Sequence, residues 1–183
     1  MKRRATFLLC LLATPALSAQ CPDPPDHAKA LTELIETAQE APNERAARRA
    51  FNEMWALWTD APDRHAQELL NEGMERREVG DLSGAIKAFD ALVAYCPDYA
   101  EGYNQRAFIN FKRQDYADAL PDLNRAIELS PRHIGALSGR ALTLLALGRQ
   151  AEATVTMRRA LELNPWLPER HLLPQIETPG KDL

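Results

Sequence analysis

The sequence predicts an all-α fold built from antiparallel helix pairs, and two observations lead to this prediction. The 183 residues include 29 Ala and 26 Leu but only 3 Val and 6 Ile. Ala and Leu are strong helix formers, whereas β-branched residues are typical of strands. The second observation is a period of 34 residues that runs through residues 66–167, with helical spacing of the apolar positions inside each period.

The first element, residues 1–19, has the pattern of a secretory signal peptide. A cationic start at residues 2–4 precedes an apolar run from Ala5 to Leu17, and the small residues Ser18 and Ala19 follow. The run is shorter than the roughly 20 apolar residues that a spanning helix needs. We therefore expect an exported, periplasmic protein with no integral membrane segment after signal cleavage.

Residues 20–27 are predicted to be an N-terminal linker that carries Cys21. Only Cys21 and Cys96 remain after cleavage of the signal, and an oxidising compartment allows them to form one disulfide. The alternative is a half-buried Cys96 and a free Cys21. A lipid anchor on Cys21 is not expected, because Gln20 stands where lipidation signals have a small residue.

Residues 28–62 are predicted to form a degenerate helical hairpin, broken near residues 42–43. Its second helix carries Phe51, Trp55 and Trp58 on one stripe. Such a stripe can serve as a ligand platform, but aromatic residues at helical spacing are more often core. We expect the stripe to cover the exposed apolar end of the first repeat, because a stack of repeats needs caps.

Five columns of residues keep the 34-residue spacing through the rest of the chain. They are Leu69, Tyr103 and Leu137; Gly73, Ala107 and Ala141; Ala85, Ala119 and Ala153; Phe89, Leu123 and Met157; and Pro97, Pro131 and Pro165. The small residues stand where two helix axes come closest, and a larger side chain there would force the helices apart. Each proline ends a second helix.

This register resembles the tetratricopeptide repeat (TPR). The repeats are 66–99, 100–133 and 134–167. The sequence departs from the family where an aromatic residue is common late in the first helix, at Arg76, Asn110 and Leu144. The resemblance implies a right-handed solenoid of helix pairs whose first helices line a concave face. Residues 168–183 are expected to form a short capping helix and a tail.

The resemblance also implies a peptide-binding groove. Its residues would be Leu70, Met74, Arg77, Glu78, Glu101, Asn104, Phe108, Phe111, Lys112, Ser138, Leu142 and Leu145. The basic clamp by which some family members hold a C-terminal carboxylate is not matched, since its positions hold Leu70, Met74, Asn104 and Phe108. We expect a protein or peptide partner with apolar anchors. The alternative is that the chain's own tail or N-terminal hairpin covers the apolar strip.

The sequence offers little support for catalysis, metals or cofactors. The four histidines are not at metal-ligand spacing, and neither a phosphate-binding glycine-rich loop nor a nucleophile elbow is present. The net charge of −4 disfavours a nucleic-acid partner. The sequence therefore predicts a non-enzymatic exported adaptor. A self-associating envelope protein, in the form of a homodimer, is the alternative, and an accessory subunit of an enzyme complex is a weaker one.

Overall fold

The structure is a computed structural model that describes residues 20–173; the predicted signal peptide, 1–19, and residues 174–183 of the predicted tail lie outside the described residues. The described helices are α1 (Ala28–Gln39), α2 (Glu44–Trp58), α3 (Arg64–Glu78), α4 (Leu82–Tyr95), α5 (Ala100–Lys112), α6 (Tyr116–Leu129), α7 (Ile134–Ala146), α8 (Gln150–Leu163) and the 3₁₀ helix η1 (Pro168–Leu172). No strand occurs between residues 20 and 173. The prediction of an all-α fold is confirmed.

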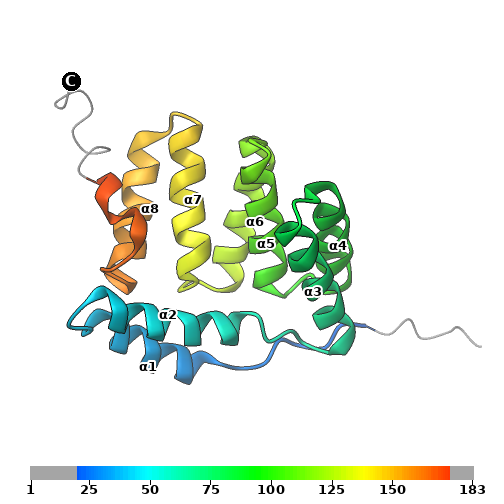
Figure 1. Ribbon diagram of the computed structural model, residues 1–183, viewed down its shortest axis with the longest axis horizontal. Helices are drawn as coiled ribbons and strands as arrows, with labels where there is room; N and C mark the ends of the chain where they lie inside the picture. Colours follow the sequence, from blue (N-terminus) through cyan, green and yellow to red (C-terminus); the bar gives the residue numbers. More distant parts are fainter. Residues whose placement is uncertain (1–19, 174–183) are drawn as a thin grey trace, which may run out of the picture.

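The helices α3 to α8 form three antiparallel pairs that stand side by side (Figure 1). This arrangement is the right-handed solenoid of helix pairs that the resemblance to the tetratricopeptide repeat implies. The tight turns within the three pairs hold Gly80, Gln114 and Gly148 in the left-handed region, with φ of 81°, 66° and 73°. Glycine adopts this conformation without steric cost, whereas Gln114 does so at a small cost.

Small residues bring the two helices of each pair close together, as the columns predict. The alanines Ala85, Ala107 and Ala119 are completely buried. In the first repeat a Cβ atom on Gly73 would overlap the ring of Phe89, which fills the space between α3 and α4. The first helix of that repeat therefore depends on glycine at this position.

The N-terminal hairpin, α1 and α2, does not lie where we expected it. It crosses the lower ends of the repeat helices, roughly at right angles to them (Figure 1). Met54 and Trp58 of α2 are buried in one cluster with Ile134 and Leu137 of α7. The prediction that the hairpin covers the free end of the first repeat is wrong.

The composition of the third repeat explains this position of the hairpin. Ile134 begins α7 at the place where the first two repeats have Ala66 and Ala100. The larger apolar side chain needs a cover, and the apolar face of the hairpin buries it completely. At the far end of the hairpin, Gln39 donates a hydrogen bond of 2.7 Å to the carbonyl of Glu162 in α8.

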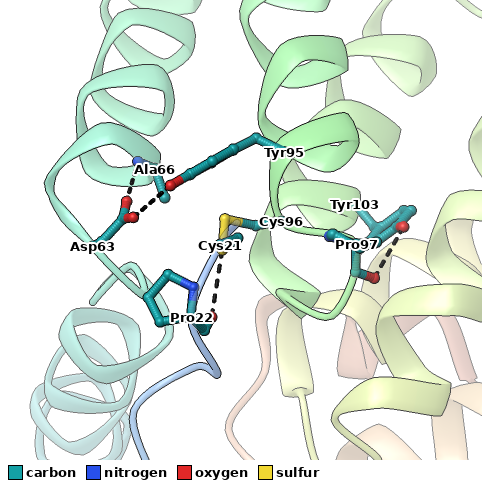
Figure 2. The surroundings of a disulfide bond; sticks show 8 residues. All are labelled: Cys21, Pro22, Asp63, Ala66, Tyr95, Cys96, Pro97 and Tyr103. Carbon is teal, nitrogen blue, oxygen red and sulfur yellow. Dashed lines mark hydrogen bonds between the residues drawn. A yellow bond between two sulfur atoms is a disulfide. The ribbon is translucent and has the colours of Figure 1, made fainter. Parts of the chain in front are cut away.

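A disulfide holds the other end of the hairpin. Cys21 is bonded to Cys96, at the end of α4, with 5.2 Å between their Cα atoms (Figure 2). The chain that leaves Cys21 runs directly into α1. Tyr99 adds a second anchor, because its hydroxyl donates a 2.7 Å hydrogen bond to the carbonyl of Trp58. The hairpin is thus fixed to the first repeat covalently and to the third repeat by packing.

Candidate functional site

The concave face is formed by the first helices of the repeats, α3, α5 and α7, and α2 crosses below the lower end of α7 toward the start of α5. The twelve predicted groove residues consequently fall into a buried set and a more exposed set, according to their position along these helices. The buried residues of the predicted groove are Leu70, Glu101, Asn104 and Ser138. The exposed or half-buried ones are Met74, Arg77, Glu78, Phe108, Phe111, Lys112, Leu142 and Leu145. We call the later turns of α3, α5 and α7, which carry this second set, the open part of the concave face.

Two of the buried residues offer no surface to a partner, so their assignment to the groove is corrected. Leu70 lies in the apolar core of the first repeat. Glu101 is 1% exposed, and its carboxylate lies 2.7 Å from Nε2 of His133. The indole of Trp58 stacks on the His133 ring, with 4.3 Å between the centroids. Glu101 is therefore linked to the start of α7 through His133 and, through the His133 ring, to α2.

Amide side chains complete this buried network. Asn104 and Gln105 both donate hydrogen bonds to the Glu101 carboxylate. Arg77 of α3 in turn donates a 2.8 Å hydrogen bond to the side-chain oxygen of Gln105. The network thus links α5 with α3, with the start of α7 and, through the Trp58 stack, with α2. Glu101, His133 and Trp58 also line a cavity of about 310 Å³ between the N-terminal hairpin and these helix ends. His133 was not among the predicted site residues, because its partner lies 32 positions away in the sequence.

Phe108 is the most exposed aromatic residue on the open part of the concave face. It is 45% exposed although it belongs to the middle repeat. The Arg77 guanidinium lies 5.5 Å from its ring centroid and the Lys112 ammonium 5.8 Å. Such cations favour the electron-rich face of an aromatic ring. The result is an apolar contact point with two positive charges beside it.

Two depressions border Phe108. The first, which we call the Trp55 pocket, has a volume of about 530 Å³ and is lined by Trp55, Arg77, Glu78, Gln105, Phe108 and Lys112. The second, which we call the Trp166 cavity, has a volume of about 320 Å³. It is lined by Glu44, Arg48, Phe51, Phe108, Gly135, Ser138, Gly139, Leu142, Asn164, Trp166, Leu167, Pro168 and Glu169. Phe108 belongs to the walls of both.

The remaining predicted residues lie at the edges of this surface. Met74 packs partly against the core of the first repeat, and Leu145 packs partly against the core of the third. The ring of Phe111 meets that of Tyr116 edge-on, with 5.3 Å between centroids. Leu142 lines the Trp166 cavity. Phe108 and Leu142 thus line one cavity, while Met74 lines neither depression.

Sequence reasoning missed the contributions of α2 and η1 to this surface. Phe51 and Trp55 come from α2, and Trp166 and Glu169 from the segment around η1. The aromatic stripe on α2 was a signal, and the structure divides it: Trp58 is core, whereas Phe51 and Trp55 are half-buried beside the open part of the concave face. Neither element carries the 34-residue pattern that located the other residues.

Charges at the rim of the Trp166 cavity come mainly from ion pairs. Glu44 accepts hydrogen bonds of 2.6 Å from Arg48 and 3.2 Å from Arg170. The bond from Arg48, followed by that from Arg170, holds the pKa of the Glu44 carboxyl below its usual value. Glu44 therefore stays ionised and paired at neutral pH.

The described residues contain no arrangement suited to metal chemistry. Between residues 20 and 173, no group of three or more His, Cys, Asp or Glu side chains could hold a metal ion. In the same range no helix has the length and apolar character needed to cross a membrane. The surface described above can bury apolar groups and pair charges, which is the chemistry of recognition.

Comparison with known proteins identifies related sequences. The tetratricopeptide repeat family model matches residues 70–134 and 109–166, which together span more than half of the chain. A TPR repeat-containing protein of Rhizobium etli is 31% identical over 114 residues, which are 62% of this chain and 56% of that protein. Human tetratricopeptide repeat protein 36 is 34% identical over 106 residues, 56% of each chain. The chain spans about half the length of these curated relatives.

Solved structures give the same result. The first TPR domain of Spaghetti (RPAP3), bound to the HSP90 peptide SRMEEVD, superposes with a TM-score of 0.60 at 27% identity, covering 61% of this chain and 90% of that one. The TPR2B domain of yeast Sti1, in a complex with pHsp70, gives a TM-score of 0.55 at 27% identity and covers 61% and 91%. These two similar structures are thus TPR domains in complexes with HSP90 peptide and with pHsp70.

Proposed function

Because the chain belongs to the tetratricopeptide repeat family, we propose that it is an exported, non-enzymatic adaptor that binds a polypeptide segment on the open part of its concave face. The observation that carries the proposal is the exposure of Phe108 between two depressions. Exposed apolar surface that continues into concave apolar walls is typical of a contact site for a partner. Similar domains bind peptides, as the RPAP3 structure does.

The mode of binding differs from recognition of a C-terminal carboxylate. The positions that would hold the basic clamp carry Leu70, Met74, Asn104 and Phe108. Leu70 and Asn104 are buried as well. A partner would instead be bound by burial of apolar anchors, with Arg77, Glu78 and Lys112 setting its orientation.

Two features support export to an oxidising compartment such as the periplasm. Residues 1–19 have the pattern of a signal peptide. The Cys21–Cys96 disulfide fits such a compartment, because cytosolic thiols are kept reduced. The same disulfide occupies the sulfur of Cys21, which argues against a lipid anchor at this residue.

The substitution Phe108→Glu tests the binding surface. We expect it to abolish capture of the partner in a cross-linking pull-down from the native cell envelope, because a carboxylate replaces the apolar anchor. The matched control is Val155→Glu, which places the same residue at an exposed apolar position on α8. Helical circular dichroism of both variants should equal that of the wild type. Capture that is unchanged by Phe108→Glu would refute the assignment.

Light scattering coupled to size-exclusion chromatography addresses self-association. An adaptor that recognises a different protein is expected to remain monomeric over a wide range of concentrations. A dimer that dissociates in Phe108→Glu but persists in Val155→Glu would instead show that the open part of the concave face joins two copies of the chain.

A further inference from the structure

The Trp166 cavity combines apolar walls with one carboxylate oxygen that has no hydrogen-bond partner. Its walls include the rings of Phe51, Phe108 and Trp166 and the side chains of Leu142 and Leu167. Its volume of about 320 Å³ lies at the lower end of the range for small-molecule sites. The space therefore suits one bulky side chain of a partner.

Glu169 supplies this oxygen. It lines the cavity, and its Oε2 atom is buried without a hydrogen-bond partner. A buried carboxylate oxygen that lacks a partner is costly, because it has lost water without gaining another donor. A donor from a bound molecule would remove this cost.

Two arginines close to Glu169, Arg48 in the same cavity wall and Arg170 next in the sequence, bind other groups. Arg48 is bound to Glu44. Arg170 is bound to Glu44 and also donates to the carbonyls of Trp166 and Leu167. The carboxylate of Glu44 in the cavity wall is thus paired with two arginines, whereas the Oε2 atom of Glu169 has no hydrogen-bond partner.

From this geometry we propose that the Trp166 cavity binds a bulky apolar side chain of a partner polypeptide and that Glu169 accepts a hydrogen bond from a lysine or arginine adjacent to it. This inference rests on the proposed function, and it specifies the partner. The charge complementarity selects the occupant, since an anionic segment would face the unpaired carboxylate. The recognised feature is therefore an apolar residue next to a cation.

Three blocked tetrapeptides test the inference by NMR titration of the purified protein. They are acetyl-Gly-Phe-Lys-Gly-amide, acetyl-Gly-Phe-Glu-Gly-amide and acetyl-Gly-Ser-Lys-Gly-amide. The backbone amides of Gly135 and Gly139, which line the cavity, report binding. We expect the Phe-Lys peptide to bind about tenfold more tightly than the Phe-Glu peptide, and the Ser-Lys peptide to leave both amides unshifted.

Glu169→Gln isolates the contribution of the carboxylate, because the amide has nearly the same shape and no charge. This variant should reduce the preference for Phe-Lys over Phe-Glu to less than about threefold. The matched control is Glu75→Gln, which removes an exposed carboxylate from α3 outside the cavity and should keep the full preference. Superimposable amide spectra outside the cavity would show that both variants fold.

The outcomes separate this inference from the proposed function. Equal binding of the Phe-Lys and Phe-Glu peptides, or a preference that survives Glu169→Gln, would overturn the inference even if Phe108→Glu still abolished partner capture. A lysine preference that is lost in Glu169→Gln would support it. If capture were then insensitive to Phe108→Glu, the cavity would bind peptides and the adaptor role would fail.

Discussion

Removal of the disulfide by Cys21→Ala should destabilise the protein strongly, because the bond closes a long loop. The two cysteines are 75 residues apart, and the loop contains α1, α2, α3 and α4. Cys21 is half-buried whereas Cys96 is buried. The substitution at Cys21 therefore breaks the cross-link while it leaves the packing around Cys96 intact.

The expected magnitude follows from the chain entropy of the unfolded state. For a loop closed over 75 residues, the entropic model gives about 4.5 kcal/mol at 25 °C. Removing a native disulfide typically costs about 2–5 kcal/mol. For a chain of this length, 4 kcal/mol corresponds to a decrease in melting temperature of roughly 10 °C.

The assay is thermal unfolding followed by circular dichroism, with wild type under oxidising and reducing conditions beside Cys21→Ala. We expect the reduced wild type and the variant to melt together, about 10 °C below the oxidised protein. Tryptophan fluorescence should change in the same transition, because Trp58 belongs to the anchored hairpin. A variant that melts within one or two degrees of the oxidised protein would refute the reasoning and show that packing alone holds the hairpin.

Three further predictions concern packing, an anchor and pH. Gly73→Ala should cost about 1–3 kcal/mol in urea unfolding, because its methyl group overlaps Phe89, and adding Phe89→Leu should recover part of this loss. Tyr99→Phe should cost about 1–2 kcal/mol by the same measurement, since it leaves the buried carbonyl of Trp58 without its donor; an unchanged midpoint would contradict this role. Hydrogen bonds from the Ala66 amide and, second, from a tyrosine hydroxyl hold the pKa of the Asp63 carboxyl below its usual 3.8. The ionised carboxylate of Asp63 therefore stabilises the folded protein above pH 3.8, and this contribution is lost as the pH falls below 3.8. Melting temperatures measured between pH 5 and pH 2 should therefore decrease less in Asp63→Asn than in wild type.

The repeats could be predicted because their information is local. The spacing of Gly73, Ala85 and Phe89 within one unit specifies a helix pair, and the same spacing recurs 34 residues later. Each pair packs mainly on its sequence neighbours, so the order of the chain gives the order of the helices in space. This part of the fold required no knowledge of long-range contacts.

The position of the hairpin could not be predicted in the same way. Its contacts join residues far apart in sequence: Gln39 meets Glu162, and Glu44 meets Arg170. Neither pair falls on the repeat period. The one local signal was Ile134, a large residue where the other repeats have alanine, and it indicates only that something covers this point.

The position of the N-terminal hairpin also explains why only part of the candidate site could be predicted. Family resemblance gave the correct helices for Phe108, Lys112 and Leu142, because these residues share one face. It could not give their exposure, which depends on how far α2 extends over each helix. Glu101 and Phe108 lie two turns apart on α5, yet one is buried by the hairpin and the other is open.

The hairpin therefore changes the kind of recognition that this concave face can perform. A long groove would bind an extended segment through many equivalent contacts along α3, α5 and α7. Here the first turns are closed, and what remains is two depressions that share the ring of Phe108 as a wall. A partner segment that fills both depressions must place one side chain on each side of Phe108. The choice of residue in the partner is then restricted at these two positions and free at most others. Specificity then depends on the charges beside each depression, Arg77 and Lys112 at one and Glu169 at the other, because apolar contacts alone do not distinguish one partner from another.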